Sequence, residues 1–388
     1  MFKYIRQRVL WAILTLFIIA FFSYILIATY APDPFEPVIE NIKTTKKGMT
    51  EAQVNAFIDE LRVTTGLARW EIINGEKLAV IYTPFERFFL YLGKIFKSGD
   101  FGFFINPANN PNSSIFTEEK GMAYLFFKPL SYTLIITGPA MLISTPLGII
   151  IGVISGYKRG KTFDNVANFF ATIIIGIPSF ILAPIFISIF MSFGIPPRVF
   201  IGQDQTIGTK IISFIPPIIV MTIVSTVGFI AFTRNQVITV LSSNYILIAK
   251  TKGLSTWQIF SKYVLRNIFI PLIGAILGSF VGLLSGSIII ETYWSVPGTS
   301  NVIAHAFPMG EINIIMFSTL FFTLISLILT IIVDISYVLL DPRITYAQKS
   351  KRNYWLFFKA WKERRKIEKD LYQTHLQSQP AQISKGEK

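Results

Sequence analysis

The sequence predicts an all-α protein that crosses a membrane several times. Of its 388 residues, 52% are hydrophobic and only 15% are charged, and the mean hydropathy is +0.54. Soluble domains carry about 25% charged residues. A helix needs about 20 mostly apolar residues to cross the hydrocarbon core of a bilayer. Six segments meet this requirement: Val9–Tyr30, Leu130–Ile154, Val166–Phe193, Ile211–Thr233, Ile268–Ile290 and Ile314–Leu340.

The first of these segments is expected to be a retained span. Val9–Tyr30 follows the basic residues Lys3, Arg6 and Arg8, which is also the arrangement of a secretory signal. Its apolar run is too long for a signal peptide, however, and no small-x-small cleavage site follows it. Six spans then place both termini on the same side of the membrane.

The distribution of Lys and Arg predicts which side this is. The chain holds 36 Lys and Arg against 22 Asp and Glu. If the N-terminus, the loops Gly156–Asn165 and Arg234–Asn267 and the tail from Asp341 lie inside, 23 of these 36 basic residues are cytoplasmic. Positive charge marks the cytoplasmic loops of membrane proteins. We therefore expect a multi-pass protein of the cell membrane with both termini in the cytoplasm, and no nucleic-acid partner.

The composition also excludes several kinds of chemistry. The absence of cysteine excludes disulfides, thiolate catalysis and Cys-ligated metals. His305 and His375 are too few and too far apart for a histidine metal site. Ser155–Thr162, SGYKRGKT, resembles a phosphate-binding loop, but its glycines are one residue too close and it follows an apolar helix rather than a strand. We expect no catalytic residue, metal or cofactor in this chain.

The stretch Ala31–Pro129 is predicted to be a small α+β domain outside the cell, between spans one and two. Thr50 and Gln53 form a capping-box pattern at the start of a helix. Asn74-Gly75 separates two short runs typical of strands, which predicts a hairpin with a type I′ turn over Leu67–Tyr82.

The next segment, Thr83–Lys97, is predicted to be an amphipathic helix. Its apolar side chains form one stripe: Phe85, Phe88, Phe89, Leu92, Ile95 and Phe96. Such a stripe packs in a core, lies in the membrane interface or, less often, binds a ligand. The pattern leaves these three interpretations open.

The tail, residues 345–388, mixes aromatic and basic side chains. Tyr354, Trp355, Phe357, Phe358 and Trp361 stand among many Lys and Arg. This mixture is typical of a helix on the inner membrane surface, against the anionic headgroups of lipids.

The loop between spans four and five, residues 234–267, carries the clearest functional pattern. It predicts a short helix, a break at Gly253, a second helix and a return to the membrane at Pro271. Glycine suits the position after a helix, where a positive φ is needed. A short helix that projects from the membrane can fill a groove in a partner, although an ordinary cytoplasmic linker would look similar.

This loop resembles the coupling loop of binding-protein-dependent ABC importer permeases. Ala249 and Gly253 match the general signature EAA-x3-G, while Leu247 and Ile248 replace its Glu and first Ala. The segment is closer to the oligopeptide and dipeptide branch, DYIRTARAKGLS…LRNALIP. The further matches in order along the chain are GDFG at Gly99–Gly102, GIPSF at Gly176–Phe180, ETYWSVPG at Glu291–Gly298, VDISY at Val333–Tyr337 and LDPRI at Leu340–Ile344.

The resemblance covers nearly all of Thr83–Ile344, and the position of GDFG before span two is similar to the B-type subunit. It departs from the branch in the Leu67–Tyr82 insertion, in Thr299-Ser300 where Leu-Gly is usual, and in the long basic tail. It implies the type I importer fold for a permease domain over 130–344, after the first span in 1–30 and the outer domain in 31–129. It also implies a C-type permease, two ABC ATPases, an external substrate-binding lipoprotein and a peptide substrate. Dipeptides, oligopeptides, glutathione and nickel are all transported in this family, and peptide is expected here.

The resemblance further implies site residues. The contact with the ATPase would be made by Asn244, Tyr245, Ala249, Lys250, Lys252, Gly253, Leu254 and Ser255. Residues expected at the pore or gate are Ser131, Thr133, Gly176, Pro178, Ser179, Ser225, Glu291, Pro297, Gly298 and Asp334. The hydroxyl groups among them are as easily explained by helix packing.

Two acids in this set have structural alternatives. Asp334 lies in the last turns of span six, where an acid inside a membrane is a functional candidate or forms an ion pair with Arg234 or Arg343. Glu291 is expected to be a gate or a contact for the binding protein, or to cap span five.

A channel or secondary transporter without an ATPase is the alternative function. It would be expected to show inverted repeats or more charged residues within its spans.

Overall fold

The architecture is mainly helical in the computed structural model, which describes residues 2–36, 39, 50–73, 76–106, 109, 121–202, 205–286, 288–340 and 354–378. Residues 2–343 form one compact unit, and the tail from residue 344 belongs to another. Within the described residues, five helical segments are long and apolar enough to cross a membrane, or six if one bent pair counts as a single span. The prediction of a helical multi-pass membrane protein is confirmed.

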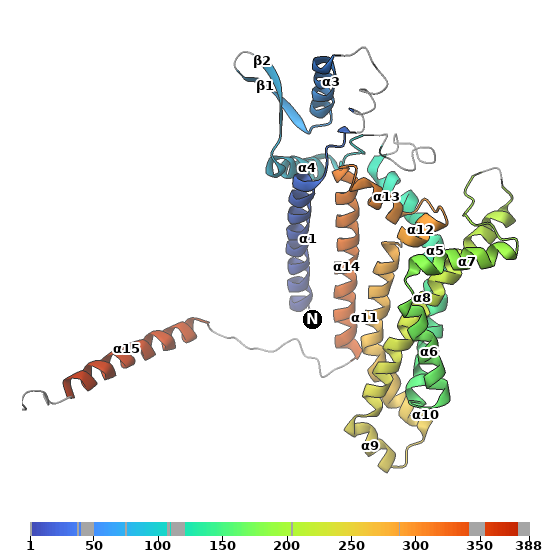
Figure 1. Ribbon diagram of the computed structural model, residues 1–388. Coiled ribbons are helices and arrows are strands. Elements are labelled where there is room, and N and C mark those ends of the chain that lie inside the picture. Colours follow the sequence, from blue (N-terminus) through green and yellow to red (C-terminus); the bar gives the residue numbers. More distant parts are fainter. Residues whose placement is uncertain are drawn as a thin grey trace, which may run out of the picture. The chain divides into compact units, whose positions relative to one another are not determined.

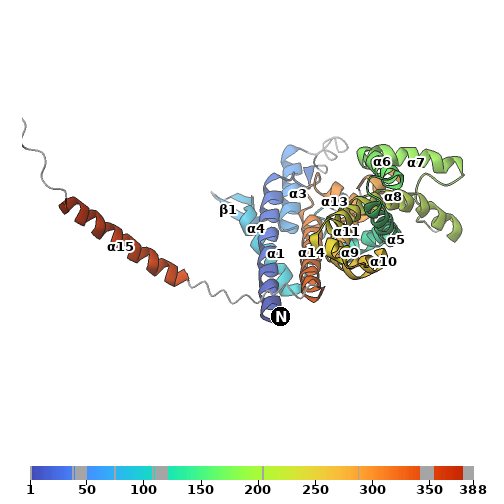
Figure 2. The ribbon, with the colours of Figure 1, turned by 90° about the horizontal axis from the view of Figure 1, so that it is seen from below.

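The long helices run side by side in the first unit. They are α1 (Phe2–Tyr30), α5 (Gly121–Tyr157), α8 (Ile207–Leu241), α11 (Leu265–Leu284) and α14 (Ile312–Leu340). Helix α14 lies between α1 and α11, both from the side and from below (Figures 1 and 2). The long helices α5 and α8 pack against each other on the far side of α11 (Figure 1).

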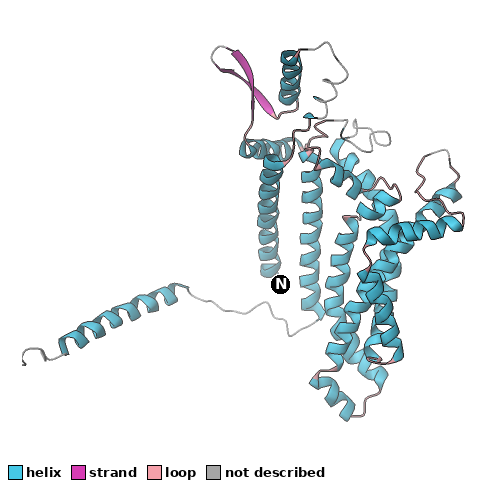
Figure 3. Ribbon diagram, in the orientation of Figure 1, coloured by secondary structure: helices cyan, strands magenta, loops and turns pink. Residues whose placement is uncertain are grey.

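The third predicted span, Val166–Phe193, is not a single straight helix. The chain instead forms α6 (Thr162–Gly176) and α7 (Ser179–Ser192), which are bent by 104° relative to each other (Figure 3). Ile177 between them is extended, with φ −88° and ψ 118°. The cause is Pro178, because the ring of a proline disfavours the helical conformation in the residue before it.

Helices α5 and α8 approach closely because three glycines on α5 face α8. Gly148, Gly152 and Gly156 are spaced four residues apart, so they lie on one face of the helix. A Cβ atom at Gly152 would lie 2.8 Å from the carbonyl oxygen of Ile230. In a membrane, where lipid is as apolar as the side chains, such small residues let two backbones approach and gain packing energy.

A small α+β region lies at one end of the long helices (Figure 1). It consists of α3 (Glu51–Thr64), the strands β1 (Ala68–Ile73) and β2 (Glu76–Ile81), and α4 (Pro84–Ser98). The strands pair antiparallel, with Ala68 opposite Ile81 and Ile73 opposite Glu76. The predicted hairpin is therefore present, although its Asn74-Gly75 turn lies outside the described residues. The predicted capping box also forms, since Gln53 Oε1 accepts from the Thr50 backbone N–H at 3.0 Å.

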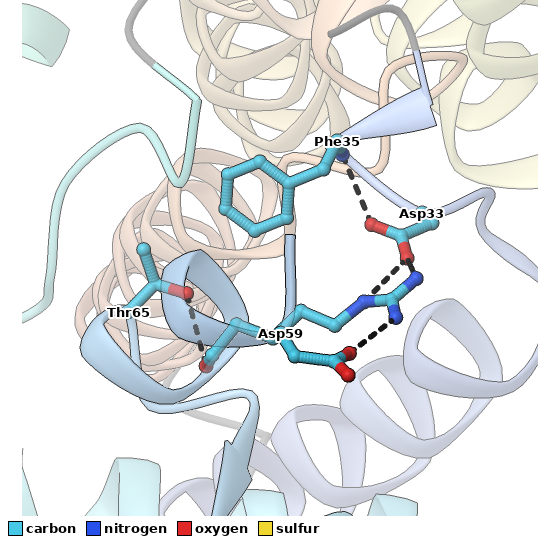
Figure 4. A network of polar contacts seen from close by, with 5 residues as sticks. Asp33, Phe35, Asp59 and Thr65 are labelled. Atoms are coloured by element: carbon cyan, nitrogen blue, oxygen red, sulfur yellow. Dashed lines mark hydrogen bonds and ion pairs between the residues drawn. The ribbon is translucent and has the colours of Figure 1, made fainter. Parts of the chain in front are cut away.

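An ion-pair network ties α3 to the chain just after α1 (Figure 4). Arg62 of α3 donates from Nε to Asp33 Oδ2 at 3.0 Å and forms a second ion pair with Asp59 at 3.3 Å. Asp33 also accepts from the backbone N–H of Phe35 at 3.0 Å. The Phe35 ring is buried in the adjoining core. The ion-pair network and the apolar core therefore both hold the segment after α1 in place.

Glu311, just before α14, holds a second junction of this region. Its carboxylate accepts from the backbone N–H of Asn106 and from the side-chain amide of Asn109, both at 2.8 Å. Glu311 is fully buried. A buried carboxylate needs such donors because its desolvation is otherwise costly, and here they fasten the segment after α4 to the start of α14.

The tail contains α15 (Tyr354–Ser378), which belongs to the second unit. Its aromatic rings form a stack of Trp355, Phe358 and Trp361. The guanidinium of Arg365 lies 4.5 Å from the centre of the Trp361 ring, which is a favourable cation–π distance. The described part of the tail is thus helical, with aromatic and basic groups combined on it.

We predict that Gly152→Ala destabilises the helix bundle, because the added methyl group forces α5 and α8 apart. Overpacking of this kind costs about 1–3 kcal/mol of unfolding free energy. Gly138→Ala on the same helix is the matched control, since a Cβ there meets nothing within 4 Å. Unfolding in mixed detergent micelles measures both variants, and equal midpoints would contradict the role of the glycine face.

Candidate functional site

A pair of short helices protrudes from the end of α8 that is remote from the α+β region (Figure 1). Helix α9 (Asn244–Thr251) follows α8 after two residues, and α10 (Thr256–Ile259) leads through a π-helical turn, Phe260–Val264, into α11. The predicted pattern of helix, break, helix and return to the membrane is therefore present.

Helix α9 has one buried and one exposed face. Ile246 and Ala249 are buried, and they pack in a cluster with Val237 and Val240 of α8 and with residues that lead into α11. On the other face, Leu247 and Ile248 are 63% and 55% exposed, and Trp257 of α10 is 71% exposed. Helices α9 and α10, residues 244–259, are called the tip below. The tip is fixed to the ends of two spans, and it presents large apolar side chains outward.

Gly253 ends α9 in the way that the sequence predicts. Its φ of 76° is in the left-handed region, and its N–H donates to the Lys250 carbonyl at 2.9 Å. The next residue, Leu254, donates to the carbonyl of Ala249 at 3.3 Å. These two bonds form a Schellman motif, which satisfies carbonyl groups at the helix end. Ser255 then starts α10 with a capping box to Gln258.

The predicted coupling residues occupy different positions on this tip. Ala249 is buried and Leu254 is half-buried, so these two anchor the tip. The Tyr245 ring stacks on Tyr263 at 6.5 Å between ring centres. The remaining predicted residues are exposed: Asn244, Lys250, Lys252, Gly253 and Ser255.

A buried ion pair lies two turns before the end of α8. Arg234 donates to both carboxylate oxygens of Asp164, at 2.6 and 2.8 Å. Asp164 also accepts from Gly160 N–H at 2.8 Å and from the hydroxyl group of Ser155. The bidentate geometry is the strong form of an Arg–carboxylate contact, and it joins the α5–α6 turn to α8 directly above the tip.

The predicted ion pair of Asp334 is corrected by this finding. Arg234 is bound to Asp164, and Asp334 instead pairs with Arg8 at 3.1 Å. The other suggested partner, Arg343, lies outside the described residues. Asp334 therefore connects α14 to α1, two helices whose contact the sequence did not indicate.

A second polar cluster surrounds Glu291 beside the N-terminal half of α5. Glu291 is part of α12 (Ile288–Tyr293) and is only 2% exposed. Its carboxylate accepts from Thr133 Oγ1 at 2.8 Å and from the backbone N–H of Asn301 at 3.0 Å. Asn301 lies in the first turn of α13 (Thr299–Ala306), so Glu291 binds the start of α13 and does not cap the fifth span.

Thr299 and Ser300, which stand where the resembled branch usually has Leu-Gly, both make hydrogen bonds around this cluster. Thr299 donates from its backbone N–H to Thr133 Oγ1 at 3.0 Å, and Ser300 donates from its hydroxyl group to the Ser285 carbonyl at 2.8 Å. Pro297 and Gly298 are buried beside them. A Cβ atom at Gly298 would lie 2.3 Å from the Glu291 carboxyl carbon, so the carboxylate occupies the space that a side chain would need.

The remaining predicted pore residues do not join one site. Gly176, Pro178 and Ser179 form the break between α6 and α7. Ser131 donates to the Lys128 carbonyl of its own helix at 2.7 Å, and Ser225 is half-buried on α8. Of the predicted set, the structure brings together Thr133, Glu291, Pro297 and Gly298. Sequence reasoning missed Asp164, whose only signal was an acid directly after the basic turn Lys158–Lys161.

The bundle of spans and its protruding tip define a multi-pass membrane protein. Residues 148–346 match the family described as "Binding-protein-dependent transport system inner membrane component", and the chain belongs to this family. The tip, the Asp164–Arg234 pair and the Glu291 cluster lie within or close to the matched region.

Curated relatives include several peptide permeases. The chain is 30% identical to the oligopeptide transport system permease protein OppB of Mycoplasma genitalium, over 68% of this chain and 63% of that protein. It is 28% identical to the dipeptide permease DppB of Lactococcus lactis, over 67% of this chain and 80% of that protein. Identity to OppB of Haemophilus influenzae is 26%, over 89% of this chain and 100% of that protein. The resemblance to oligopeptide and dipeptide importer permeases is confirmed.

We predict that Asp164→Asn destabilises the protein by about 3–5 kcal/mol, the usual cost of removing one partner of a buried ion pair. Asp334→Asn is the matched control, because the side chains of Asp334 and its partner Arg8 are 14% and 43% exposed, against 2% and 21% for Asp164 and Arg234. Unfolding in mixed micelles measures both variants. If Asp164→Asn lost no more unfolding free energy than Asp334→Asn, the Asp164–Arg234 ion pair would not be what holds the α5–α6 turn to α8.

Proposed function

We propose that this chain is the B-type permease subunit of an ATP-driven importer and forms half of a pathway for oligopeptides or dipeptides. The observation that carries the proposal is the α9–α10 tip, which is anchored by Ile246 and Ala249 and exposes Leu247, Ile248 and Trp257. The family of the chain and the names of its relatives support the importer class and the peptide substrate.

In this proposal the tip inserts into a groove of one of two ABC ATPase subunits. An amphipathic helix binds a groove by its exposed apolar side chains, which here are Leu247 and Ile248. Closure of the ATPases on ATP would then move the tip and, through it, α8. Such coupling requires that the ATPase contacts the tip differently in its two states, because only differential binding shifts an equilibrium.

The remaining partners follow from the same class. A homologous C-type permease would supply the other half of a type I importer pathway, and an external lipoprotein would deliver the substrate. Residues 1–30, 31–129, 130–344 and 345–388 would be the first span, an extracytoplasmic domain, the permease domain and a cytoplasmic tail. With the tip in the cytoplasm, the N-terminus of α1 is cytoplasmic and the α+β region is outside, since they lie at the corresponding ends of α1 (Figure 1).

The translocation pathway is proposed to involve the Glu291 cluster as its outer gate. Thr133, Glu291, Pro297 and Gly298 are buried together beside the N-terminal half of α5, which is remote from the tip. The break at Pro178 is a second place where the helix path changes direction. Chains in membranes tolerate such broken helices where protein or a water-filled cavity surrounds them.

We predict that Gly253→Asp reduces ATP-driven peptide uptake about tenfold or more, the scale of a typical coupling energy between two sites. The substitution adds a side chain and a negative charge next to Lys252, at the exposed end of α9. Gly253 has φ 76°, and a Cβ atom there would have no neighbour within 4 Å. Uptake into proteoliposomes and membrane insertion are measured together.

Gly194→Asp is the matched control for this experiment. Gly194 has φ 75° and an equally open Cβ position, but it follows α7 and is not part of the tip. Uptake should therefore persist in Gly194→Asp. Normal uptake by Gly253→Asp, or equal loss in both variants, would refute the coupling role.

Purification in detergent distinguishes an ATP-driven importer from a channel or secondary transporter that works without an ATPase. The tagged chain should bring with it a second six-span permease and two ABC ATPase subunits, with ATPase activity. Recovery of the chain alone, with transport in the absence of ATP, would favour a channel or secondary transporter.

A further inference from the structure

Helix α4 has three distinct faces, where the sequence pattern indicated one apolar stripe. Phe88 and Tyr91 are 0% and 6% exposed and face the core. Lys94 and Lys97 are exposed on a polar face. Between these faces lies an apolar row that the described part of the chain leaves uncovered, the phenylalanine face: Phe85, Phe89 and Phe96, which are 55%, 61% and 84% exposed.

Aromatic contacts fix the level of α4 along α1. The Phe88 ring lies 6.1 Å from Phe17, 5.2 Å from Phe21 and 5.6 Å from Tyr24, between ring centres. At 1.5 Å per residue, Phe17 and Tyr24 lie about 20 Å and about 9 Å before the end of α1 at Tyr30. Helix α4 therefore contacts α1 within its candidate membrane span, Tyr4–Tyr30, and crosses it at a steep angle (Figure 1).

The phenylalanine face continues the apolar surface of α1. Phe85 lies 6.0 Å from Phe21, and the neighbouring α1 side chains Ile18 and Phe22 are 43% and 59% exposed. The α1 surface contacts lipid if α1 spans the bilayer, because few of its side chains are buried in the protein. A surface continuous with it, and made only of phenylalanine, meets the same apolar surroundings.

We propose that α4 lies in the plane of the membrane interface, with Phe85, Phe89 and Phe96 inserted among phospholipid acyl chains. Lys94 and Lys97 then extend toward the headgroups, as long basic side chains do at an interface. Thr83 caps the helix, since its Oγ1 accepts from the backbone N–H of Glu86 at 3.3 Å. The backbone N–H of Thr83 in turn donates to Glu86 Oε2 at 2.8 Å, which holds the pKa of Glu86 below its usual range.

The position of α4 in the interface also positions the α+β region. Only Tyr82 and Thr83 separate β2 from α4, so the depth of α4 sets the height of the hairpin above the membrane. The proposal requires α1 to be a span but does not depend on ATP-driven import. Its failure is therefore distinguishable from failure of the proposed function.

Single-cysteine labelling tests this inference, because the chain has no cysteine of its own. The variants are Phe89→Cys and Phe96→Cys on the phenylalanine face and Lys97→Cys as the adjacent control on the polar face. Each full-length chain carries an environment-sensitive fluorophore in phospholipid nanodiscs. Phe96 is 84% exposed, so its replacement leaves the fold intact.

We expect lipids with a spin label in the upper part of the acyl chain to quench positions 89 and 96 at least about twofold more than position 97. Aqueous iodide should show the reverse order. Equal access of iodide to all three positions would overturn the proposal. It would also be overturned if lipid quenching at 89 and 96 disappeared when the assembled importer replaced the lone chain, because a partner protein would then cover this face.

Discussion

The close approach of α5 and α8 is the constraint on which the arrangement of the bundle depends. Inside a bilayer there is little hydrophobic gain from joining two apolar helices, so contact depends on how closely their backbones fit. Gly148, Gly152 and Gly156 provide that fit. Ser155, which is next to Gly156, donates to Asp164, and Asp164 pairs with Arg234 of α8. The glycine face thus sets the distance at which this ion pair forms.

This packing also determines how a displacement at the tip would travel in the proposed importer. Only Ser242 and Ser243 separate α8 from α9, and the buried face of α9 packs on the last turns of α8. Close-packed elements resist compression and move as units. A displaced tip therefore carries α8 with it, and the Asp164–Arg234 pair transmits the movement to the α5–α6 turn.

The sequence predicted the features that depend on local pattern and missed those that depend on contacts between distant segments. Hydropathy located the spans, and Gly253 correctly marked the end of α9 because positive φ is a local property. Hydropathy does not indicate the 104° bend, since it measures the length of an apolar run and not its direction. The signal for the bend is Pro178, because a proline disfavours the helical conformation in the residue before it. Arg234 pairs with an acid 70 residues away, and no local pattern distinguishes that acid from Asp334.

The buried carboxylates of this chain share one arrangement that limits what Glu291 can do. Asp164 and Glu291 each accept a backbone N–H near the start of a helix, where such groups lack helical partners and membrane water is scarce. Glu311 accepts the backbone N–H of Asn106, in the loop after α4. Both oxygens of Glu291 are occupied, one by Thr133 and the other by Asn301. Glu291 is only 2% exposed, and the contacts that cover it include the bond between Thr299 of α13 and Thr133 of α5. A substrate can reach this carboxylate only if that packing opens. In the proposed importer, gating at Glu291 and release of α13 from α5 are therefore the same event.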